Sequence, residues 1–424
     1  MPIHSTLEPD AVRRDREALR ILLGGMLGLA LAMGIGRFAF TPILPLMQRD
    51  LGMSNATAGW IAGLNYLGYL AGAISCSLLP QLLRSRLLTS AALLASIATT
   101  LLMGATVSVF GWGMLRLVGG CASAILFIVI SAEVADALTR RGHFHWTGAL
   151  YGGVGLGIAL SGSLVPILDA FGQWRGAWAG MGLLAALLAF AGIALGRRQD
   201  MIQTIPAETA VQSGGMRAIW MLAIAYFFEG LGYVVTATFL VAIIAATPGL
   251  APYAPYSWVA VGLAAIPSTI LWPQLARRCG ARIALLLAFG VQAAGILASI
   301  WAENFWLVLF AAVSFGATFL GIVALTMAEG ARRVPHDRRR AAAVLTAAFG
   351  IGQVLGPPLA GVMADLRHGF TLPLLLATLS IFVGGVFLAI DRCFSPPSAK
   401  EATLCPTSTS RSPAKAPPPS RKPG

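Results

Sequence analysis

Charged residues are scarce in this chain of 424 residues. Only 11% of them are Asp, Glu, Lys or Arg, whereas 57% are hydrophobic. Soluble globular proteins are about a quarter charged, so this chain lacks the charge needed to cover a surface in water. The composition favours a membrane protein instead, because its 48 glycines and ten tryptophans suit close helix packing and anchoring at the lipid interface.

Motifs for catalysis and for cofactor binding are also missing from the sequence. No phosphate-binding loop ends in Gly-Lys-Ser/Thr, which argues against direct use of ATP. The five cysteines are scattered without the spacing of metal ligands, and we expect free thiols. His143 and His145 fall in a predicted loop and are not expected to bind a metal. We therefore predict no enzyme activity, no metal and no cofactor.

Long apolar runs take the place of charge. At about 20 apolar residues per membrane crossing, the sequence divides into twelve predicted spans with short connections. Each span should be an α-helix, because lipid offers no hydrogen-bond partner to the backbone. The predicted spans are 19–46, 55–79, 87–107, 109–137, 146–169, 174–196, 217–246, 256–276, 282–302, 304–331, 341–365 and 370–391.

Arginine and lysine residues gather on one side of these spans. With the N-terminus placed inside, 25 of the 30 fall in cytoplasmic segments, and the opposite loops hold only Arg49, Arg175 and Arg367. Short cytoplasmic loops are typically enriched in Lys and Arg. We therefore predict a bacterial inner (plasma) membrane protein with both termini in the cytoplasm. The net charge of +13 is then a sign of topology, and no nucleic-acid partner is expected.

The chain repeats itself. The run "GIGRF" at 34–38 recurs as "GLGYV" at 230–234, and "YGGVGLGIALSG" at 151–162 parallels "FGIGQVLGPPLAG" at 349–361. A parallel repeat of six-span units predicts two pseudo-symmetric bundles that enclose a central cavity and rock about it. The predicted parts are a cytoplasmic N-terminal segment (1–18), a first bundle (19–196), a cytoplasmic linker (197–216), a second bundle (217–391) and a disordered cytoplasmic tail (392–424).

This organisation resembles the major facilitator superfamily over residues 19–391. The runs "GIGRFAFTPILPLM", "AGLNYLGYLAG" and "ALYGGVGLGIALSG" resemble the YbfB/YjiJ-type bacterial branch more narrowly. The resemblance implies an all-α fold, transport by alternating access, and a cavity lined by spans one, four, seven and ten. The loop after the second span keeps only the basic residues of the superfamily's motif. The fifth span lacks the Gly-Pro pair typical of antiporters.

Two arginines interrupt the apolar spans. Arg37 lies about 12 Å along its helix from Pro45, and Arg116 about 10 Å from the start of its span, so both have similar depth. A lipid-facing arginine would cost at least ~2.5–3.5 kcal/mol. If the resemblance holds, both arginines face one water-filled space and would bind an anionic substrate. The alternatives are structural: Arg116 could bond to backbone carbonyls, and Arg37 could bind carbonyls exposed near Pro42.

Acidic residues in the spans suggest two further roles. Glu229 lies near the predicted midplane and is the candidate for proton coupling, because intramembrane carboxyl groups commonly relay protons. The alternative is a fixed salt bridge from Glu229 to one of the two arginines. Glu133, Asp136 and Glu329 lie nearer the cytoplasmic ends, where we expect gate or interface roles.

Polar side chains elsewhere in the spans complete the predicted site. Asn65, Tyr69, Tyr151, Tyr233 and Gln353 could bind substrate or a neighbouring helix, since a buried polar group needs a partner. We expect a monomeric secondary active transporter of a small organic solute, preferably an anion, with protons as a candidate coupling ion. The alternatives are a proton-coupled exporter of amphipathic drug-like compounds and a non-transporting receptor or scaffold.

Overall fold

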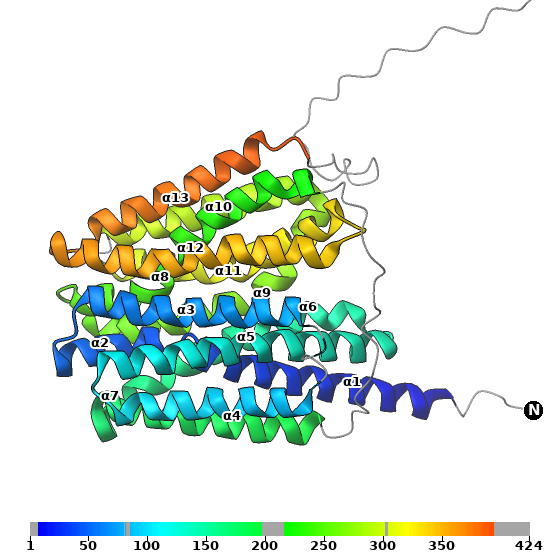
Figure 1. Ribbon diagram of the computed structural model, residues 1–424, viewed down its shortest axis with the longest axis horizontal. Coiled ribbons are helices and arrows are strands. Elements are labelled where there is room, and N and C mark those ends of the chain that lie inside the picture. The colour runs from blue at the N-terminus through cyan, green and yellow to red at the C-terminus, as the bar shows by residue number, and fades with distance from the viewer. Residues whose placement is uncertain (1–6, 80, 82–84, 197–215, 302–303, 394–424) are drawn as a thin grey trace, which may run out of the picture.

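The computed structural model describes residues 7–79, 81, 85–196, 216–301 and 304–393. Every regular element in these ranges is a helix (Figure 1). Most of the predicted linker and tail, at 197–215 and 394–424, lies outside the described residues. The long helices are α1 (Leu7–Leu29), α2 (Phe40–Leu51), α3 (Asn55–Leu78), α4 (Arg86–Leu102), α5 (Val109–Arg140), α7 (Gly152–Gly196), α8 (Trp220–Ala246), α9 (Ala254–Cys279), α10 (Ala281–Ala298), α11 (Phe305–Arg333), α12 (Arg338–Leu366) and α13 (Thr371–Ile390).

Short helical segments connect or extend these helices. The π-helix η1 (Ala30–Ile35) joins α1 to the turn before α2. The others are η3 (Met103–Ala105), η4 (Phe144–Trp146), α6 (Thr147–Leu150), η5 (Met216–Ile219), η6 (Ala251–Tyr253) and η7 (Ser299–Trp301).

The helix α1 begins earlier than the sequence suggests. It starts at Leu7, twelve residues before the predicted start of the first span, and its first turns project beyond the bundle (Figure 1). Arg13 and Glu17, one turn apart, form an ion pair of 3.5 Å on this extension. Pairs at this spacing stabilise an exposed helix, so the helix continues into the polar segment.

Eleven helical segments in the described residues are long and apolar enough to cross a membrane. One of them, Phe144–Leu195, has 52 residues, which at 1.5 Å per residue far exceeds a hydrocarbon core of about 30 Å. The backbone leaves helical geometry within α7 at Gly172 and Gln173. Beyond this break the chain folds back on itself. Gly180 then lies so close to Leu168 that a Cβ at Gly180 would be 2.4 Å from the Leu168 side chain. The helix α7 therefore supplies two antiparallel spans, and the prediction of twelve spans is confirmed.

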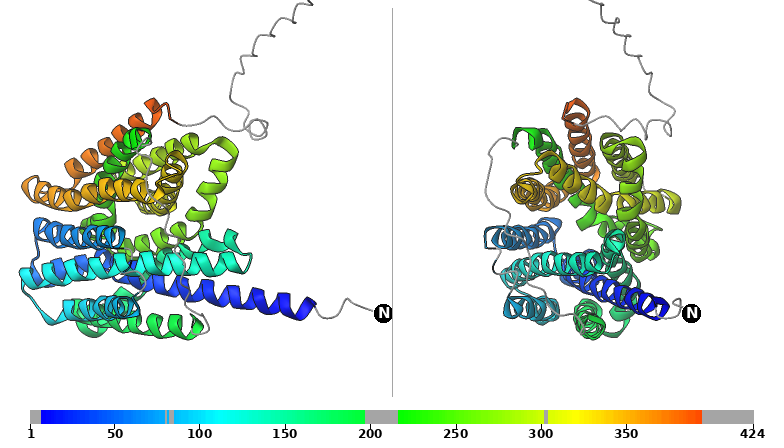
Figure 2. Two further views of the ribbon diagram at one scale, coloured as in Figure 1. Left: turned by 45° about the vertical axis from the view of Figure 1, so that its right-hand side comes forward. Right: turned by 90° about the vertical axis from the view of Figure 1, so that its right-hand side faces the viewer.

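The spans form two bundles. The N-terminal bundle, α1 to α7, lies beside the C-terminal bundle, α8 to α13, in both Figure 1 and Figure 2. Close contacts between the bundles join α3 to α12, α7 to α9, and α2 to α8. In the internal repeat, α3 corresponds to α9 and the first part of α7 to α12, so the first two contacts are equivalent. The predicted pseudo-symmetry of the two halves is confirmed.

Glycine backbone forms these contacts. A Cβ at Gly59 of α3 would lie 2.2 Å from the carbonyl oxygen of Pro357 in α12. On the equivalent contact, a Cβ at Gly262 of α9 would lie 2.6 Å from the carbonyl oxygen of Gly155 in α7. Contacts below 3 Å exclude any side chain, and small residues let membrane helices approach this closely. The repeated glycine motifs therefore mark where the two bundles meet.

Candidate functional site

The first span is broken near its middle. In the π-helix η1 and the turn after it, the backbone N–H groups of Gly36 and Phe38 donate to carbonyls five residues back, at 2.8 and 3.0 Å. Pro42 has no N–H and its ring displaces the preceding turn. The N–H of Thr41 donates to the carbonyl oxygen of Phe38 at 3.2 Å, three residues back. In a regular helix it would donate to the carbonyl of Arg37, four residues back, so that carbonyl loses its usual helical donor. Breaks of this kind are frequent at functional sites.

Arg116 of α5 donates hydrogen bonds to backbone carbonyls at this break. Its Nη1 donates to the carbonyl oxygen of Gly36 at 3.0 Å, and its Nη2 to that of Arg37 at 2.8 Å. The guanidinium carbon also lies 5.2 Å from the Phe40 ring centroid. The carbonyl of Arg116 in turn accepts a hydrogen bond of 2.8 Å from Asn65 of α3. Arg116 and Asn65 thus tie α5 and α3 to the broken span.

Arg37 is buried beside aromatic rings. The residue is only 4% exposed. Its guanidinium carbon lies 4.1 Å from the ring centroid of Tyr69 and 4.7 Å from that of Tyr66. Its Nε and Nη2 have no hydrogen-bond partner among the described residues. Contact with aromatic faces stabilises a desolvated cation by about 2 kcal/mol, which offsets only part of the desolvation penalty of an arginine.

Parallel aromatic rings of the C-terminal bundle lie beside Phe38, the residue after Arg37. Tyr226 of α8 stacks on Phe349 of α12 at 4.2 Å, and Phe349 stacks on Tyr233 at 5.3 Å. Phe319 of α11 continues the column, parallel to Tyr233 at 6.4 Å. The Phe319 end of this column packs against Phe38, the residue after Arg37, with the two ring centroids 6.0 Å apart. We call the rings of Tyr226, Phe349, Tyr233 and Phe319 the ring column.

The other predicted polar residues lie around the same region. Gln353 of α12 donates to the Tyr233 hydroxyl, which places two predicted site residues in direct contact. Tyr233 and Tyr69 both lie within electrostatic range of Arg37. Tyr151 packs against Phe127 with ring centroids 5.7 Å apart. The structure thus gathers Arg37, Tyr69, Tyr233 and Gln353, while Asn65 serves helix packing.

Glu229 lies apart from both arginines. It is 1% exposed, and its Oε1 accepts a hydrogen bond of 2.7 Å from Gln292 of α10. Gln292 in turn accepts a bond of 2.8 Å from Thr318 of α11. Within the described residues, no ion pair joins Glu229 to an arginine, and its Oε2 has no hydrogen-bond partner. A buried carboxyl group held only by neutral groups is able to exchange a proton.

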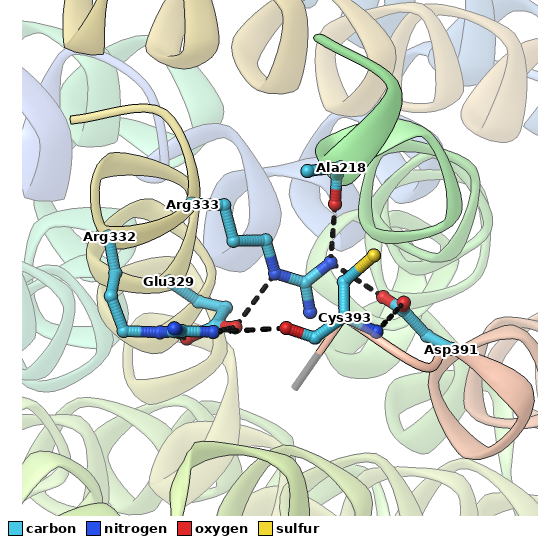
Figure 3. Close-up of polar contacts among 6 residues, drawn as sticks. All are labelled: Ala218, Glu329, Arg332, Arg333, Asp391 and Cys393. Carbon is cyan, nitrogen blue, oxygen red and sulfur yellow. Dashed lines mark hydrogen bonds and ion pairs between the residues drawn. The ribbon is translucent and has the colours of Figure 1, made fainter. Parts of the chain in front are cut away.

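The predicted gate or interface residues lie near the arginine-rich ends of α5 and α11. Figure 3 shows Glu329 in a buried network, where its Oε1 accepts from Arg333 Nε at 2.7 Å and its Oε2 from Arg332 Nε at 2.7 Å. Arg333 also donates to Asp391 at 2.6 Å and to the carbonyl of Ala218 at 2.8 Å. This network joins the end of α11 to the end of α13 and to η5, all in one bundle.

On α5, Asp136 pairs with Arg140 one turn away, as the spacing predicts. Glu133 is half-buried on the same helix. The gate or interface role of these two residues and of Glu329 stays a prediction.

Several site residues were missed from the sequence. Tyr66 contacts the Arg37 guanidinium, and its position three residues before Tyr69 places it on the same face of α3. Gln292 and Thr318 hold Glu229 through a chain of hydrogen bonds. Gln292 had a signal, because an amide alone in the apolar run 282–302 needs a buried partner.

The fold and this central site define a transporter of the major facilitator superfamily. The chain belongs to the family described as "Uncharacterised MFS-type transporter YbfB", which matches residues 29–389. It is therefore a multi-pass membrane protein and a secondary transporter of a small molecule, rather than an enzyme. The predicted membership of the YbfB-type branch of the major facilitator superfamily is confirmed.

Solved structures agree on the fold. The nucleoside transporter NupG is similar over 89% of this chain and 99% of its own, with 16% identity and a TM-score of 0.65. A mutant of NupG gives a TM-score of 0.69 at 13% identity, over 88% and 99% of the two chains. A bacterial homolog of the human lysosomal transporter Spinster, inward-facing and occupied, gives 0.64 at 14% identity, over 90% and 97%. No curated protein matches the chain.

Proposed function

We propose that this protein carries a small organic anion across the membrane by alternating access, with Arg37 as the contact to its negative charge. The observation that carries the proposal is the burial of Arg37 at the break of the first span. Its Nε and Nη2 lack a partner among the described residues, its guanidinium contacts the ring of Tyr69, and the neighbouring Phe38 meets Phe319 of the other bundle. A buried cation needs a counter-charge, and a bound anion supplies one.

Arg116 has a different part in this proposal. Its two guanidinium bonds to the carbonyls of Gly36 and Arg37 fix the turn from which the Arg37 side chain projects. Arg116 then acts as a positioning residue, and its charge reaches the substrate only through the electrostatic field. Tyr69, Tyr233 and Gln353 are proposed as further substrate contacts because they surround Arg37 from both bundles.

Protons are the proposed coupling ion, with Glu229 as their carrier. The carboxyl group lies between α8, α10 and α11, where Gln292 holds one oxygen through a neutral hydrogen bond. Such a partner permits both the charged and the protonated carboxyl, whereas an arginine partner would hold the charged form. Rocking of the bundles would then expose Glu229 to each side in turn.

The proposed orientation places the arginine-rich side in the cytoplasm. Arg140 and Arg141 end α5, and Arg332 and Arg333 end α11, on the side where α1 begins. The enrichment of arginine in cytoplasmic loops then assigns that side. The proposal includes the bacterial inner membrane, a monomer, and no nucleic-acid partner.

A second candidate is a proton-coupled exporter of amphipathic compounds. The ring column favours it, because four stacked aromatic rings offer an apolar wall to a large hydrophobic solute. In that case Arg37 would serve the structure of the first span and would make no contact with substrate.

Uptake by proteoliposomes separates the two candidates. A panel of organic anions, neutral compounds and amphipathic cations would be measured with and without an imposed pH gradient. We expect anions to enter and Arg37→Gln to abolish their entry. Arg175→Gln is the matched control, because Arg175 is exposed and also lies over an aromatic ring, that of Trp174 at 5.2 Å. Transport of amphipathic cations that Arg37→Gln leaves unchanged would establish the second candidate.

A further inference from the structure

The two partnerless nitrogens of Arg37 belong to one edge of the guanidinium. Nε and the Nη2 beside it point their N–H bonds in the same direction, and neither has a hydrogen-bond partner in the described parts of the chain. We call them the Nε–Nη2 edge. We propose that this edge binds the carboxylate of an aromatic acid, whose ring extends toward the ring column. This inference rests on the proposed transport of an organic anion and names its chemical class.

The spacing of the Nε–Nη2 edge suits a carboxylate. Two parallel N–H donors in a fixed plane match the two oxygens of one carboxylate group, and both bonds are charge-assisted. The rings of Tyr69 and Tyr66 lie 4.1 and 4.7 Å from the guanidinium carbon. A planar carboxylate can lie in the guanidinium plane beside these rings. The oxygens of a tetrahedral phosphonate project out of that plane toward them.

The surroundings of the edge suit an aromatic body. Phe38 follows Arg37 in the chain and meets Phe319 of the ring column at 6.0 Å, edge to face. Tyr233 lies 8° from parallel with Phe349 and 6° from parallel with Phe319. A ligand ring in the same orientation would therefore make an offset stack with the column. Such aromatic pairs are favourable by about 0.5–1.5 kcal/mol beyond the burial of their area.

Polar atoms among these rings also point to a ligand. The Tyr226 hydroxyl and the Oε1 of Gln353 are buried and have no hydrogen-bond partner in the described residues. Both belong to side chains that contact Tyr233 or its stacked neighbour Phe349. Both side chains belong to the C-terminal bundle, whereas Arg37 belongs to the N-terminal bundle. A ligand bound to the Nε–Nη2 edge and to these atoms would therefore lie between the two bundles.

Binding to the purified full-length protein in detergent tests the assignment. Benzoate is the first probe, and three relatives each change one property: cyclohexanecarboxylate removes the aromatic ring, benzamide the charge, and phenylphosphonate the planar anion. We expect titration calorimetry to show benzoate binding about threefold to tenfold more tightly than cyclohexanecarboxylate, the ratio that corresponds to one aromatic stack. Benzamide should bind at least about tenfold more weakly than benzoate, because its single uncharged oxygen cannot replace both carboxylate oxygens. Phenylphosphonate should also bind at least about tenfold more weakly, because one of its oxygens is directed out of the guanidinium plane against the rings of Tyr69 and Tyr66.

Two variants separate the edge from a general effect of charge. Arg37→Lys keeps the cation but cannot form the paired bonds, so benzoate should bind about tenfold to a hundredfold more weakly. Phe319→Leu keeps the whole guanidinium and removes one ring of the ring column, and it serves if Arg37→Lys does not fold. It should reduce benzoate binding more than cyclohexanecarboxylate binding. Arg175→Lys is the matched control and should bind benzoate as the wild type does.

Different failures have different meanings. Phenylphosphonate binding as tightly as benzoate, with both dependent on Arg37, would overturn the carboxylate and leave the proposed anion transport standing. Equal binding of benzoate and cyclohexanecarboxylate would overturn the aromatic body. Binding of none of the acids at millimolar concentration by folded protein would overturn the aromatic acid as a class. Benzamide binding as tightly as benzoate, unaffected by Arg37→Lys, would overturn both this inference and the proposed function.

Discussion

The hydroxyl of Thr41 in α2 donates a hydrogen bond of 2.5 Å to the backbone carbonyl of Ala237 in α8. The two residues are 196 positions apart, which is also the offset between "GIGRF" and "GLGYV" in the internal repeat. Equivalent positions of the two halves thus touch each other. Two equivalent residues can meet only beside the axis that relates them, so this hydrogen bond lies next to the pseudo-two-fold axis.

The Thr41–Ala237 bond should favour the state in which α2 and α8 are together. Thr41→Val keeps the shape of the side chain and removes the donor, and a hydrogen bond of this kind is worth about 0.5–1.5 kcal/mol. We expect the separated state to become about twofold to tenfold more populated. Distances between spin labels at Trp60 and Leu366, both largely exposed, would report it. Thr41→Ser keeps the donor and should match the wild type; an equal shift in both variants would exclude the hydrogen bond as the cause.

Asp365 at the end of α12 should hold the arginine-poor side closed. Its two oxygens accept from the backbone N–H groups of Asn55 at 3.1 Å and Ala56 at 2.8 Å, in the first turn of α3. Asp365 also accepts from the Asn55 side chain at 2.9 Å. A carboxylate is favourable at a helix N-terminus, and this one links the two bundles. We expect Asp365→Asn to raise the population of the open state about tenfold, measured with the same pair of spin labels.

A matched aspartate provides the control for Asp365. Asp169 lies on the same side of the molecule and pairs with Arg49 at 2.8 Å, but both residues belong to the N-terminal bundle. Asp169→Asn should therefore leave the distance between Trp60 and Leu366 unchanged. If it opens the molecule as far as Asp365→Asn does, a general loss of negative charge is responsible, and the bond to α3 is not.

The two buried arginines should differ in their effect on stability. Arg116→Gln removes donors from the carbonyls of Gly36 and Arg37, and should lower the free energy of unfolding by about 2 kcal/mol. Arg37→Gln removes a buried cation that has no carboxylate partner among the described residues, and should leave stability unchanged or raised. Thermal unfolding in detergent would measure both variants beside Arg175→Gln. Earlier unfolding of Arg37→Gln than of Arg116→Gln would reverse the two roles.

Glu229→Gln should separate exchange from accumulation. The new amide oxygen can still accept from Gln292, so the protein should fold and exchange substrate across the liposome membrane. It cannot release a proton, so accumulation driven by an imposed pH difference should be lost. Glu17→Gln is the control, since Glu17 is partly exposed near the start of α1 and pairs only loosely, with Arg13 at 3.5 Å and with Arg141 at 3.8 Å, and such pairs contribute little to stability. Full accumulation by Glu229→Gln would place proton coupling at another residue.

The spans and their duplication could be predicted because each leaves a signal within one stretch of chain. An apolar run of membrane length predicts a helix, and a repeated run such as "GIGRF" predicts its counterpart. The burial of Arg37 and Arg116 in one region also follows from their equal depth in two spans. These predictions need no knowledge of how one helix is rotated against another.

The partners of the buried charges depend on that rotation. Arg116 bonds to carbonyls that become available because the first span breaks before Pro42. The sequence offered backbone carbonyls as one alternative for Arg116, but it did not show which carbonyls, because that depends on how α5 is rotated against the first span. Glu229 accepts a hydrogen bond from Gln292 of α10 and forms no ion pair with Arg37 or Arg116 among the described residues, although a salt bridge to one of the two arginines was the alternative that the sequence left open. Asp365 lies at the end of a predicted span, where a carboxylate is common, so the sequence does not single it out. Its partner Asn55 is 310 residues away in the chain and could not be found from the local sequence.

The glycine-lined contacts between the bundles have a kinetic consequence. Where Gly59 meets Pro357, and Gly262 meets Gly155, backbone touches backbone at distances that exclude side chains. At these two points the bundles can move over each other without exchanging interlocked side chains, so we expect these points to add little to the barrier between states. We expect the resting state to be set elsewhere, by polar links such as those of Asp365 and Thr41. Turnover rate and conformational preference would then depend on different residues, and selection could adjust one without disturbing the other.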